Sequence, residues 1–206
     1  MKVFSDVLGS VSTNCYYVYN EDTGECVIID PAADAGRIEE RLISGNMKPV
    51  AILLTHGHFD HILATDKLRE KYGIKVYANI DEKEVLESTQ LNLSETFGFS
   101  YTTYADVYLS NGDTIKLAGM EFFCIATPGH TKGGMCYYLP ESDVLFSGDT
   151  LFNMSVGRTD FPTGNTYTLG RSIREKLMVL PENTVVYPGH DMSTTIGYEL
   201  ANNPCF

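Results

Sequence analysis

Residues 51–61 are the stretch that most limits how this chain can fold and what it can do. An apolar run ends here in a segment with three histidines and an aspartate, namely His56, His58, Asp60 and His61. Imidazole and carboxylate groups are the ligands of borderline divalent metals such as zinc. A polar loop after a buried strand would explain one histidine, but not four such side chains at this spacing. The segment therefore predicts a metal site at the end of a strand.

The same local design occurs at four places in the chain. A predicted strand ends, a small residue or Pro-Gly turns the backbone, and a metal-binding side chain follows. The four segments are residues 54–56, 127–130, 147–149 and 187–190. Strands that share a sheet in compatible directions would bring these side chains together at one edge.

All five histidines of the chain lie in these segments or within five residues after the first of them, whereas histidines that serve as core or surface residues would be scattered. Two aspartates complete a set of seven candidate ligands: His56, His58, Asp60, His61, His130, Asp149 and His190. One zinc ion takes about four ligands. Seven ligands therefore suggest two divalent metal ions that share one carboxylate. We expect zinc, although iron and manganese accept the same ligand types.

Composition limits the classes of partner. The formal net charge is −12 and there is no basic run, so the chain repels phosphate backbones and nucleic acid is not an expected partner. The 206 residues suffice for one sizeable core or two small domains, and 43% hydrophobic with 20% charged residues is typical of a globular protein. We expect one domain over residues 1–206.

Compartment is predicted from the cysteines and the first residues. Five widely spaced cysteines without a C-x-x-C pair favour reduced thiols, as in cytosolic proteins. The chain starts without an apolar signal core, and no stretch approaches transmembrane length. We therefore expect a cytoplasmic protein that does not associate with membranes.

Apolar periodicity predicts mixed strands and helices. Expected strands cover residues 1–8, 14–20, 25–29, 50–54, 74–78, 107–109, 114–117, 121–126, 135–139, 144–146 and 184–187. Expected helices run from an N-cap at Asp34 to Gly45, from Asp60 to Gly73, and over 81–88, 167–179 and 194–201. Residues 89–104 show no clear pattern, and a long loop is expected over 153–165.

The seven ligands also carry a family resemblance. The sequence resembles the metallo-β-lactamase superfamily, whose signature H-x-H-x-D-H, followed by a distant His, Asp and His, is filled here at every position. Segments 55–58, 127–131, 148–150, 157–160 and 199–204 look like those of the short, single-domain glyoxalase II-like (hydroxyacylglutathione hydrolase-like) hydrolases. The resemblance spans nearly the whole chain. It implies an α+β fold, the αββα four-layer sandwich, with the metal site at one edge of the β-sandwich.

The resemblance also implies a role for each ligand. His56, His58 and His130 would hold a first metal, Asp60, His61 and His190 a second, and Asp149 would bridge the two. Asp30, at a strand end, resembles an acid of this family that orients a ligand histidine. The alternative for Asp30 is an aspartate that simply ends a strand before Pro31.

The implied reaction is hydrolysis of a small-molecule thioester, such as an S-acylglutathione. A hydroxide that bridges the metals would attack the carbonyl carbon, with Asp60 orienting it and Asp149 bridging. The thiolate would leave without a strong acid, because thiols have a pKa near ~8.5.

Glutathione recognition is where the chain departs from the family. Full-length glyoxalase II enzymes carry an additional helical domain whose basic residues bind the glutathione carboxylates. Here sixteen residues follow His190 (206 − 190), and none is Lys or Arg. Lys132 and Arg158 are the remaining candidate substrate contacts. The alternatives are a solvated lysine at the surface and an arginine that pairs with Asp160 to brace its loop.

Three other functions stand as alternatives to thioester hydrolysis. Residues 157–161 also look like those of the persulfide dioxygenases of this superfamily, which use a single iron held by the first-site ligands. Periplasmic β-lactamases have a signal peptide and typically a cysteine where His61 stands, so a lactamase or lactonase is less favoured. A purely structural metal site would be closed and rich in cysteine.

Overall fold

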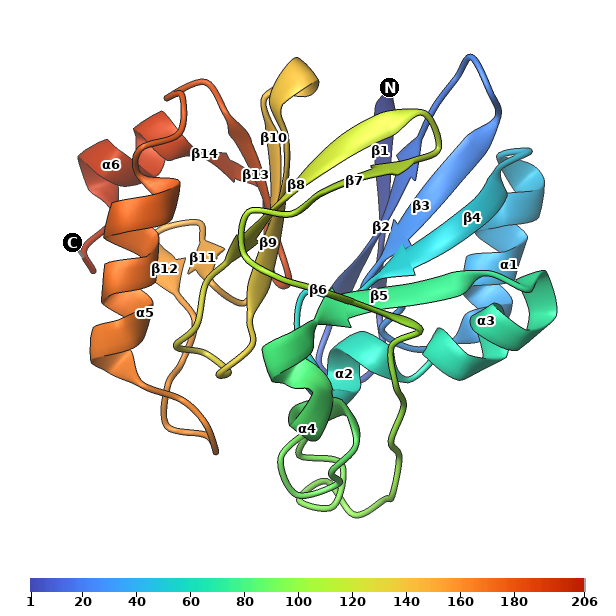
Figure 1. Cartoon of the computed structure of the whole chain (residues 1–206), viewed down its shortest axis with the longest axis horizontal. Helices are drawn as coiled ribbons and strands as arrows, with labels where there is room; N and C mark the ends of the chain where they lie inside the picture. The colour runs from blue at the N-terminus through green and yellow to red at the C-terminus, as the bar shows by residue number, and fades with distance from the viewer. Residues whose placement is uncertain (206) are drawn as a thin grey trace.

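A computed structural model of the chain describes residues 1–205 as two six-stranded β-sheets that pack face to face (Figure 1). The first sheet has the order β1-β2-β3-β4-β5-β6 and the second the order β14-β13-β10-β9-β8-β7. The first contains β1 (Lys2–Leu8), β2 (Thr13–Tyr19), β3 (Glu25–Ile29), β4 (Lys48–Leu53), β5 (Lys75–Asn79) and β6 (Val107–Leu109). The second contains β7 (Thr114–Leu117), β8 (Met120–Ala126), β9 (Met135–Leu139), β10 (Val144–Gly148), β13 (Val185–Pro188) and β14 (Thr194–Thr195). A small hairpin pairs β11 (Leu151–Phe152) with β12 (Ser155–Val156).

Helices cover the outer side of each sheet. Figure 1 shows α1 and α3 beside the first sheet, and α5 and α6 beside the second. The helices associated with the first sheet are α1 (Ala35–Ser44), α2 (Phe59–Ile62), α3 (Thr65–Tyr72), η1 (Ile80–Glu82) and α4 (Lys83–Leu86). Those associated with the second are the turn η2 (Pro140–Ser142), α5 (Thr166–Ser172), its π-helical extension η3 (Ile173–Leu177) and α6 (Ile196–Asn202).

Three apolar clusters hold these layers together, and β2 shows why. Side chains alternate between the two faces of a strand. Tyr17 therefore packs with Ile38 of α1, whereas its neighbour Tyr16 packs with Phe146 of the second sheet. A third cluster joins the second sheet to Leu169 of α5. The four-layer αββα sandwich expected from the sequence is confirmed.

The directions of the strands determine at which edge of each sheet the ligand-bearing strands end. In the first sheet β3 and β4 are parallel, so their carboxyl ends meet at one edge, and the start of the antiparallel β2 lies there too. In the second sheet β10 is parallel to β13, and β8 and β10 are both antiparallel to β9. The candidate ligands therefore come from both sheets, and not from the single sheet that the repeated strand-end design suggested.

Several predicted elements differ in detail. The helix expected from Asp60 to Gly73 is divided into α2 and α3, because the Ala64 N–H donates to the Pro31 carbonyl and not to the preceding helical turn. Asp34 does precede α1, but its side chain makes no capping hydrogen bond. The expected helix over 167–179 continues from α5 as a π-helix, and the loop over 153–165 contains β12.

The structure gives the state of the cysteines and the character of the helices. All five cysteines are free, and only Cys205 of the five is exposed. Over residues 1–205, no helix combines the length and the apolar character that crossing a bilayer requires.

Candidate metal centre

Each candidate ligand follows directly after a strand or lies on the first turn of a helix. His56 and His58 come from the loop after β4, and Asp60 and His61 lie on α2. On the second sheet, residues 130, 149 and 190 follow β8, β10 and β13. Parallel and antiparallel pairing places these three strand ends at the same edge.

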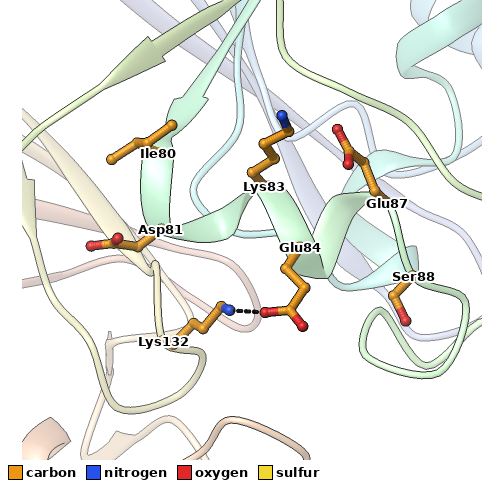
Figure 2. Close-up of a pocket in the computed structure, with 7 residues that line it drawn as sticks. All are labelled: Ile80, Asp81, Lys83, Glu84, Glu87, Ser88 and Lys132. Atoms are coloured by element: carbon orange, nitrogen blue, oxygen red, sulfur yellow. Dashed lines mark hydrogen bonds and ion pairs between the residues drawn. The ribbon is translucent and has the colours of Figure 1, made fainter.

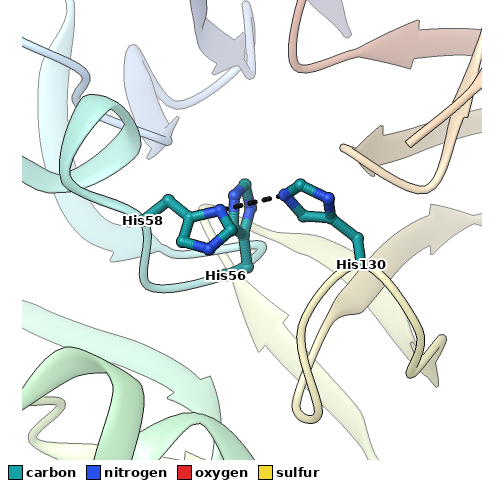
Figure 3. A group of neighbouring side chains, drawn as sticks. All are labelled: His56, His58 and His130. Atoms are coloured by element: carbon teal, nitrogen blue, oxygen red, sulfur yellow. Dashed lines mark hydrogen bonds between the residues drawn. The ribbon is translucent and has the colours of Figure 1, made fainter. Parts of the chain in front are cut away.

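The seven side chains form three overlapping groups, in each of which one ligand atom per residue lies within 4.8 Å of the others. The groups are His56, His58 and His130; His56, His61 and Asp149; and Asp60, His61 and His190. Figure 3 shows the first, in which Nδ1 of His58 is 2.9 Å from Nε2 of His130. The structure thus brings together all seven residues that the sequence singled out.

Asp149 lies between the two ends of this cluster. Its Oδ1 is 3.4 Å from Nε2 of His61, and its Oδ2 is 3.5 Å from Nε2 of His130 and 3.6 Å from Nε2 of His190. At the far end, Nε2 of His190 is 3.3 Å from Oδ2 of Asp60. One carboxylate therefore contacts ligands of both predicted sites.

Hydrogen bonds on the outer nitrogen fix how three of the histidines face the cluster. Nδ1–H of His130 donates to the carbonyl of Arg158 at 2.7 Å, and Nδ1–H of His190 donates to the carbonyl of Ser12 at 3.3 Å. Nδ1 of His61 is 2.9 Å from Oδ2 of Asp30. Each ring therefore turns Nε2 inward, which is how a partner on the other ring nitrogen orients a metal ligand.

Unpaired buried atoms show that these residues fit a metal. The Nε2 atoms of His56, His58 and His61 and Oδ1 of Asp149 are buried, and within residues 1–205 they make no hydrogen bond. A buried polar atom left without a partner costs about 1–3 kcal/mol, so four neighbouring ones need an explanation. Divalent cations bound by these atoms supply it, and the donor set of imidazole and carboxylate suits zinc, iron or manganese.

The pKa values of two histidines favour neutral rings. Burial lowers the pKa of His56 well below 6.5, and burial together with the neighbouring His130 lowers that of His58 to about 3. Neutral imidazole is the form that binds metal. These two side chains can therefore accept a cation without first losing a proton at neutral pH.

The carboxylates at the cluster stay ionised. Burial alone would raise the pKa of Asp149 and Asp60, but His61 and its neighbours hold the first well below 3.8 and the second at about 2. His61 is the counterpart: burial would lower its pKa, yet Asp60 and Asp149 raise it well above 6.5. A cation at Nε2 of His61 takes the place of that proton.

Asp30 and Thr55 brace the ligand loop from behind. Asp30 is 2% exposed, and its Oδ1 accepts the Thr55 N–H at 2.8 Å while Oδ2 accepts the Thr55 hydroxyl at 2.6 Å. The same Oδ2 faces His61. Asp30 thus contacts the candidate ligand His61 directly.

Sequence reasoning missed two polar residues at the start of β2. Thr13 donates its hydroxyl to Oδ2 of Asp60 at 2.9 Å. Asn14 donates its amide to the carbonyls of Pro188 and Asp191, on either side of His190. Their position as small polar residues at a strand start was the available signal, but only the antiparallel pairing of β2 with β3 brings them to the cluster.

Glu82 is the third missed residue. It is fully buried, its Oε1 accepts the Gly57 N–H at 2.8 Å, and its Oε2 accepts the Thr131 hydroxyl at 3.0 Å. Gly57 lies between two candidate ligands and Thr131 directly follows a third, so one carboxylate ties together the two loops of the first site. Its spacing of three and four residues from Val85 and Leu86, both buried, was a usable signal.

Gly189 explains one of the Pro-Gly turns. A Cβ atom at this position would lie 2.1 Å from Oδ1 of Asp149 and 2.7 Å from Cε1 of His61. Any larger residue would displace two candidate ligands. Close approach of the backbone to the candidate ligands therefore requires glycine here.

A cavity of about 400 Å³ opens onto the ligands. Besides ligand side chains, it is lined mainly by apolar residues of the loop that follows α4 and of the β11–β12 region. Arg158 reaches this cavity, but its guanidinium donates to both carboxylate oxygens of Asp160, at 2.7 and 2.6 Å. Arg158 therefore forms the ion pair with Asp160 that the sequence suggested as the alternative to a substrate contact.

Lys132 lies at a different hollow. Figure 2 shows it paired with Glu84 of α4 at a surface cavity of about 720 Å³, whose lining includes none of the seven candidate ligands. Lys132 is not among the residues that line the metal cavity. Its predicted substrate contact therefore has no support from its position, which fits the alternative of a surface lysine.

Comparison with known proteins gives a family for this geometry. Residues 8–190 match the model of the family described as the metallo-beta-lactamase superfamily. The chain is 39% identical to the probable metallo-hydrolase YqgX of Bacillus subtilis over 199 residues, 96% of this chain and 93% of the relative. It is 34% identical to the hydroxyacylglutathione hydrolase GloC of Haemophilus influenzae over 197 residues, 93% of this chain and 91% of the relative.

Two solved structures extend the comparison. The BLEG-1 B3 metallo-beta-lactamase superposes with a TM-score of 0.94 at 41% identity, covering 98% of each chain. TTHA1623, solved in a di-iron-bound form, superposes with a TM-score of 0.88 at 34% identity, covering 98% of this chain and all of the other.

Proposed function

The chain belongs to the metallo-β-lactamase superfamily and is a metal-dependent hydrolase with a His/Asp metal site; we propose that it hydrolyses thioesters with two divalent metal ions bound. The second ligand group carries this proposal. Asp60, His61 and His190 stand beside the all-histidine group, and Asp149 contacts both. A single metal ion at the all-histidine group would leave Asp60, His61 and His190 without a bound cation.

Our proposal gives His56, His58 and His130 to the first metal, Asp60, His61 and His190 to the second, and Asp149 to both. Two divalent cations supply Lewis acidity toward an ester carbonyl and lower the pKa of water toward neutrality. We propose zinc. The similar chain TTHA1623 was solved with two irons, so iron is a second candidate for the same ligands.

The protein's own residues orient the reacting groups. Thr13 holds one oxygen of Asp60, and that carboxylate stays ionised because its pKa is about 2. Asp60 can therefore accept a hydrogen bond from water in the cavity and direct it toward a carbonyl carbon. Asp30 keeps Nε2 of His61 facing inward. The thiolate needs no strong acid, since thiols have a pKa near ~8.5.

Similarity to a hydroxyacylglutathione hydrolase supports the thioester as substrate. GloC of Haemophilus influenzae, which bears that name, is similar over more than nine-tenths of both chains. In our proposal the present chain acts on the same kind of bond. Its compartment is proposed to be the cytoplasm.

β-Lactam hydrolysis is a second candidate, favoured by one observation. BLEG-1, described as a B3 metallo-beta-lactamase, is 41% identical to this chain. A β-lactam belongs in the same substrate panel.

Persulfide oxidation at a single iron is the third candidate. It is carried by the resemblance of residues 157–161, where Arg158 pairs with Asp160 and its carbonyl accepts from His130. This function needs only the first ligand group, so it leaves Asp60, His61 and His190 unexplained.

Release of free thiol from thioesters tests the proposal. Purified protein is assayed with S-lactoylglutathione and a set of other thioesters, before and after a chelator and after zinc is restored. We expect thiol release that stops with the chelator and returns with zinc. Metal-loaded protein that releases thiol from no thioester would contradict the proposal.

A further inference from the structure

The cavity beside the metal ligands has two groups of apolar side chains, one from each half of the chain. The first group is Phe59, Leu93 and Phe97, and the second is Phe152, Val156 and Phe161. Each group adjoins the ligands: Phe59 precedes Asp60, the Phe161 ring is 5.9 Å from the His58 ring, and the Phe152 ring is 6.2 Å from the His190 ring. A molecule that fills this cavity beside the candidate ligands therefore contacts both groups.

Two members of the first group are held in costly states. Phe97 packs against Phe59 with the two rings tilted at 41° and their centres 4.5 Å apart, yet 54% of Phe97 stays exposed. Leu93 has a φ of +70°, a conformation that a bulky residue rarely adopts, while its side chain lines the cavity. Strained and exposed apolar residues of this kind are typical of ligand-binding surfaces.

Apart from the proposed metal ions, the charged groups of this cavity do not favour an anionic group on the substrate. Arg158 is the one lysine or arginine that lines it, and both oxygens of Asp160 take up its guanidinium while Phe161 covers its face at 3.9 Å. Asp191 adds a carboxylate to the lining. Glutathione carries two carboxylates, and each would need a cation or donor in exchange for water.

We propose, on the premise that the chain hydrolyses thioesters, that its preferred thioesters have an apolar acyl group and an uncharged thiol portion. Phe97 and Phe161 set this preference by contact with those groups. Water provides the oxygen of the new C–O bond, the C–S bond breaks, and its electron pair leaves with sulfur. The products are a carboxylate, a thiol and one proton.

Four thioesters separate the contributions of the two ends of the substrate. Acetyl and phenylacetyl groups are each joined to glutathione and to N-acetylcysteamine, which is uncharged. We expect kcat/KM to be at least about tenfold higher for the phenylacetyl than for the acetyl ester of N-acetylcysteamine, because apolar walls bury the phenyl ring. We expect both glutathione esters to be poorer than their uncharged counterparts.

Variants assign this preference to the cavity. Phe97→Ala and Phe161→Ala should each lower the ratio of the phenylacetyl rate to the acetyl rate by about three- to tenfold, whatever either substitution does to the acetyl ester rate itself. Tyr167→Ala removes another exposed aromatic ring, 74% exposed on α5 and outside the cavity, and should leave the preference unchanged. The wild-type panel decides the matter even if a variant fails to fold.

Three results of these assays would contradict the proposed substrate preference or the role of the two phenylalanines. Glutathione esters cleaved as well as or better than uncharged ones, with no phenylacetyl advantage, would overturn this inference and leave thioester hydrolysis standing. If Phe97→Ala and Phe161→Ala both still cleave the phenylacetyl ester faster than the acetyl ester by the wild-type factor, these two residues do not set the preference. Failure to cleave any of the four esters with metal bound would overturn the inference together with the proposed function.

Discussion

Glu82 provides the sharpest test of how the ligand loops are held. Its Oε1 accepts the N–H of Gly57, while its Oε2 faces the Thr131 hydroxyl and the Gly133 N–H. In Glu82→Gln, one oxygen becomes an NH₂ group. Whichever way the amide is turned, that group meets a backbone N–H, so one buried donor loses its acceptor.

The magnitude follows from that lost acceptor. An unsatisfied buried donor costs about 1–3 kcal/mol, and for a chain of this length about 2 kcal/mol corresponds to a fall in Tm of roughly 6 °C. Because burial raises the pKa of Glu82 to about 7, against 4.5 ordinarily, the folded wild type binds an extra proton between those pH values. Wild-type stability from this group therefore falls as the pH rises through that window, by about 1.4 kcal/mol per pH unit at most.

Thermal unfolding of metal-free protein between pH 5 and pH 7 measures both effects. Glu82→Gln should be destabilised most at pH 5, and the gap to wild type should narrow toward pH 7, because glutamine has no proton to lose. Glu84→Gln is the matched control, since Glu84 lies two residues away, is exposed and pairs with Lys132; its effect should stay within about 0.5 kcal/mol. A Glu82→Gln variant that behaves like the control, or a gap that widens with pH, would refute this account of Glu82.

Three further substitutions test the metal centre. His61→Ala should lower the metal content from two ions to one per chain and remove most thioester hydrolysis; near-normal hydrolysis would count against the two-metal proposal. Gly189→Ala places a Cβ 2.1 Å from Oδ1 of Asp149, so competition with a chromogenic chelator should show metal affinity at least about tenfold weaker, and an unchanged affinity would mean that this close approach is not required. Thr13→Val deletes the hydrogen bond to Asp60 with little change in volume and should cost about 10- to 100-fold in activity with the fold intact; an active variant would remove Thr13 from the proposed mechanism.

The seven candidate ligands, which the structure brings together, could be picked out from the sequence because each one lies close to a strand end. Each strand end carries its ligand within a few residues, and all five histidines of the chain are committed to these segments. The αββα architecture was implied by resemblance, and the alternation of β2 between two apolar clusters gives it a physical basis. The distribution of the ligands over two sheets did not follow, because strand order depends on pairing between distant segments.

Long-range contacts account for what sequence reasoning missed. The break between α2 and α3 results from a hydrogen bond to Pro31, more than thirty residues earlier. Glu82 contacts partners 25 and 49 residues away. Residues 89–104, which show no periodicity, are ordered by polar side chains: Asn92 donates to the Tyr101 carbonyl at 2.7 Å, and Ser94 is buried beside it. Such contacts leave no periodic signal in the sequence.

Metal content measured together with two activities tests the central claim most directly. The protein is purified without oxygen, its metals are quantified, and one sample is assayed for thioester hydrolysis and for oxygen uptake with a glutathione persulfide. We predict about two metal ions per chain, thiol release from a thioester and no oxygen uptake. One iron per chain, with oxygen uptake and without thiol release, would contradict the proposed function.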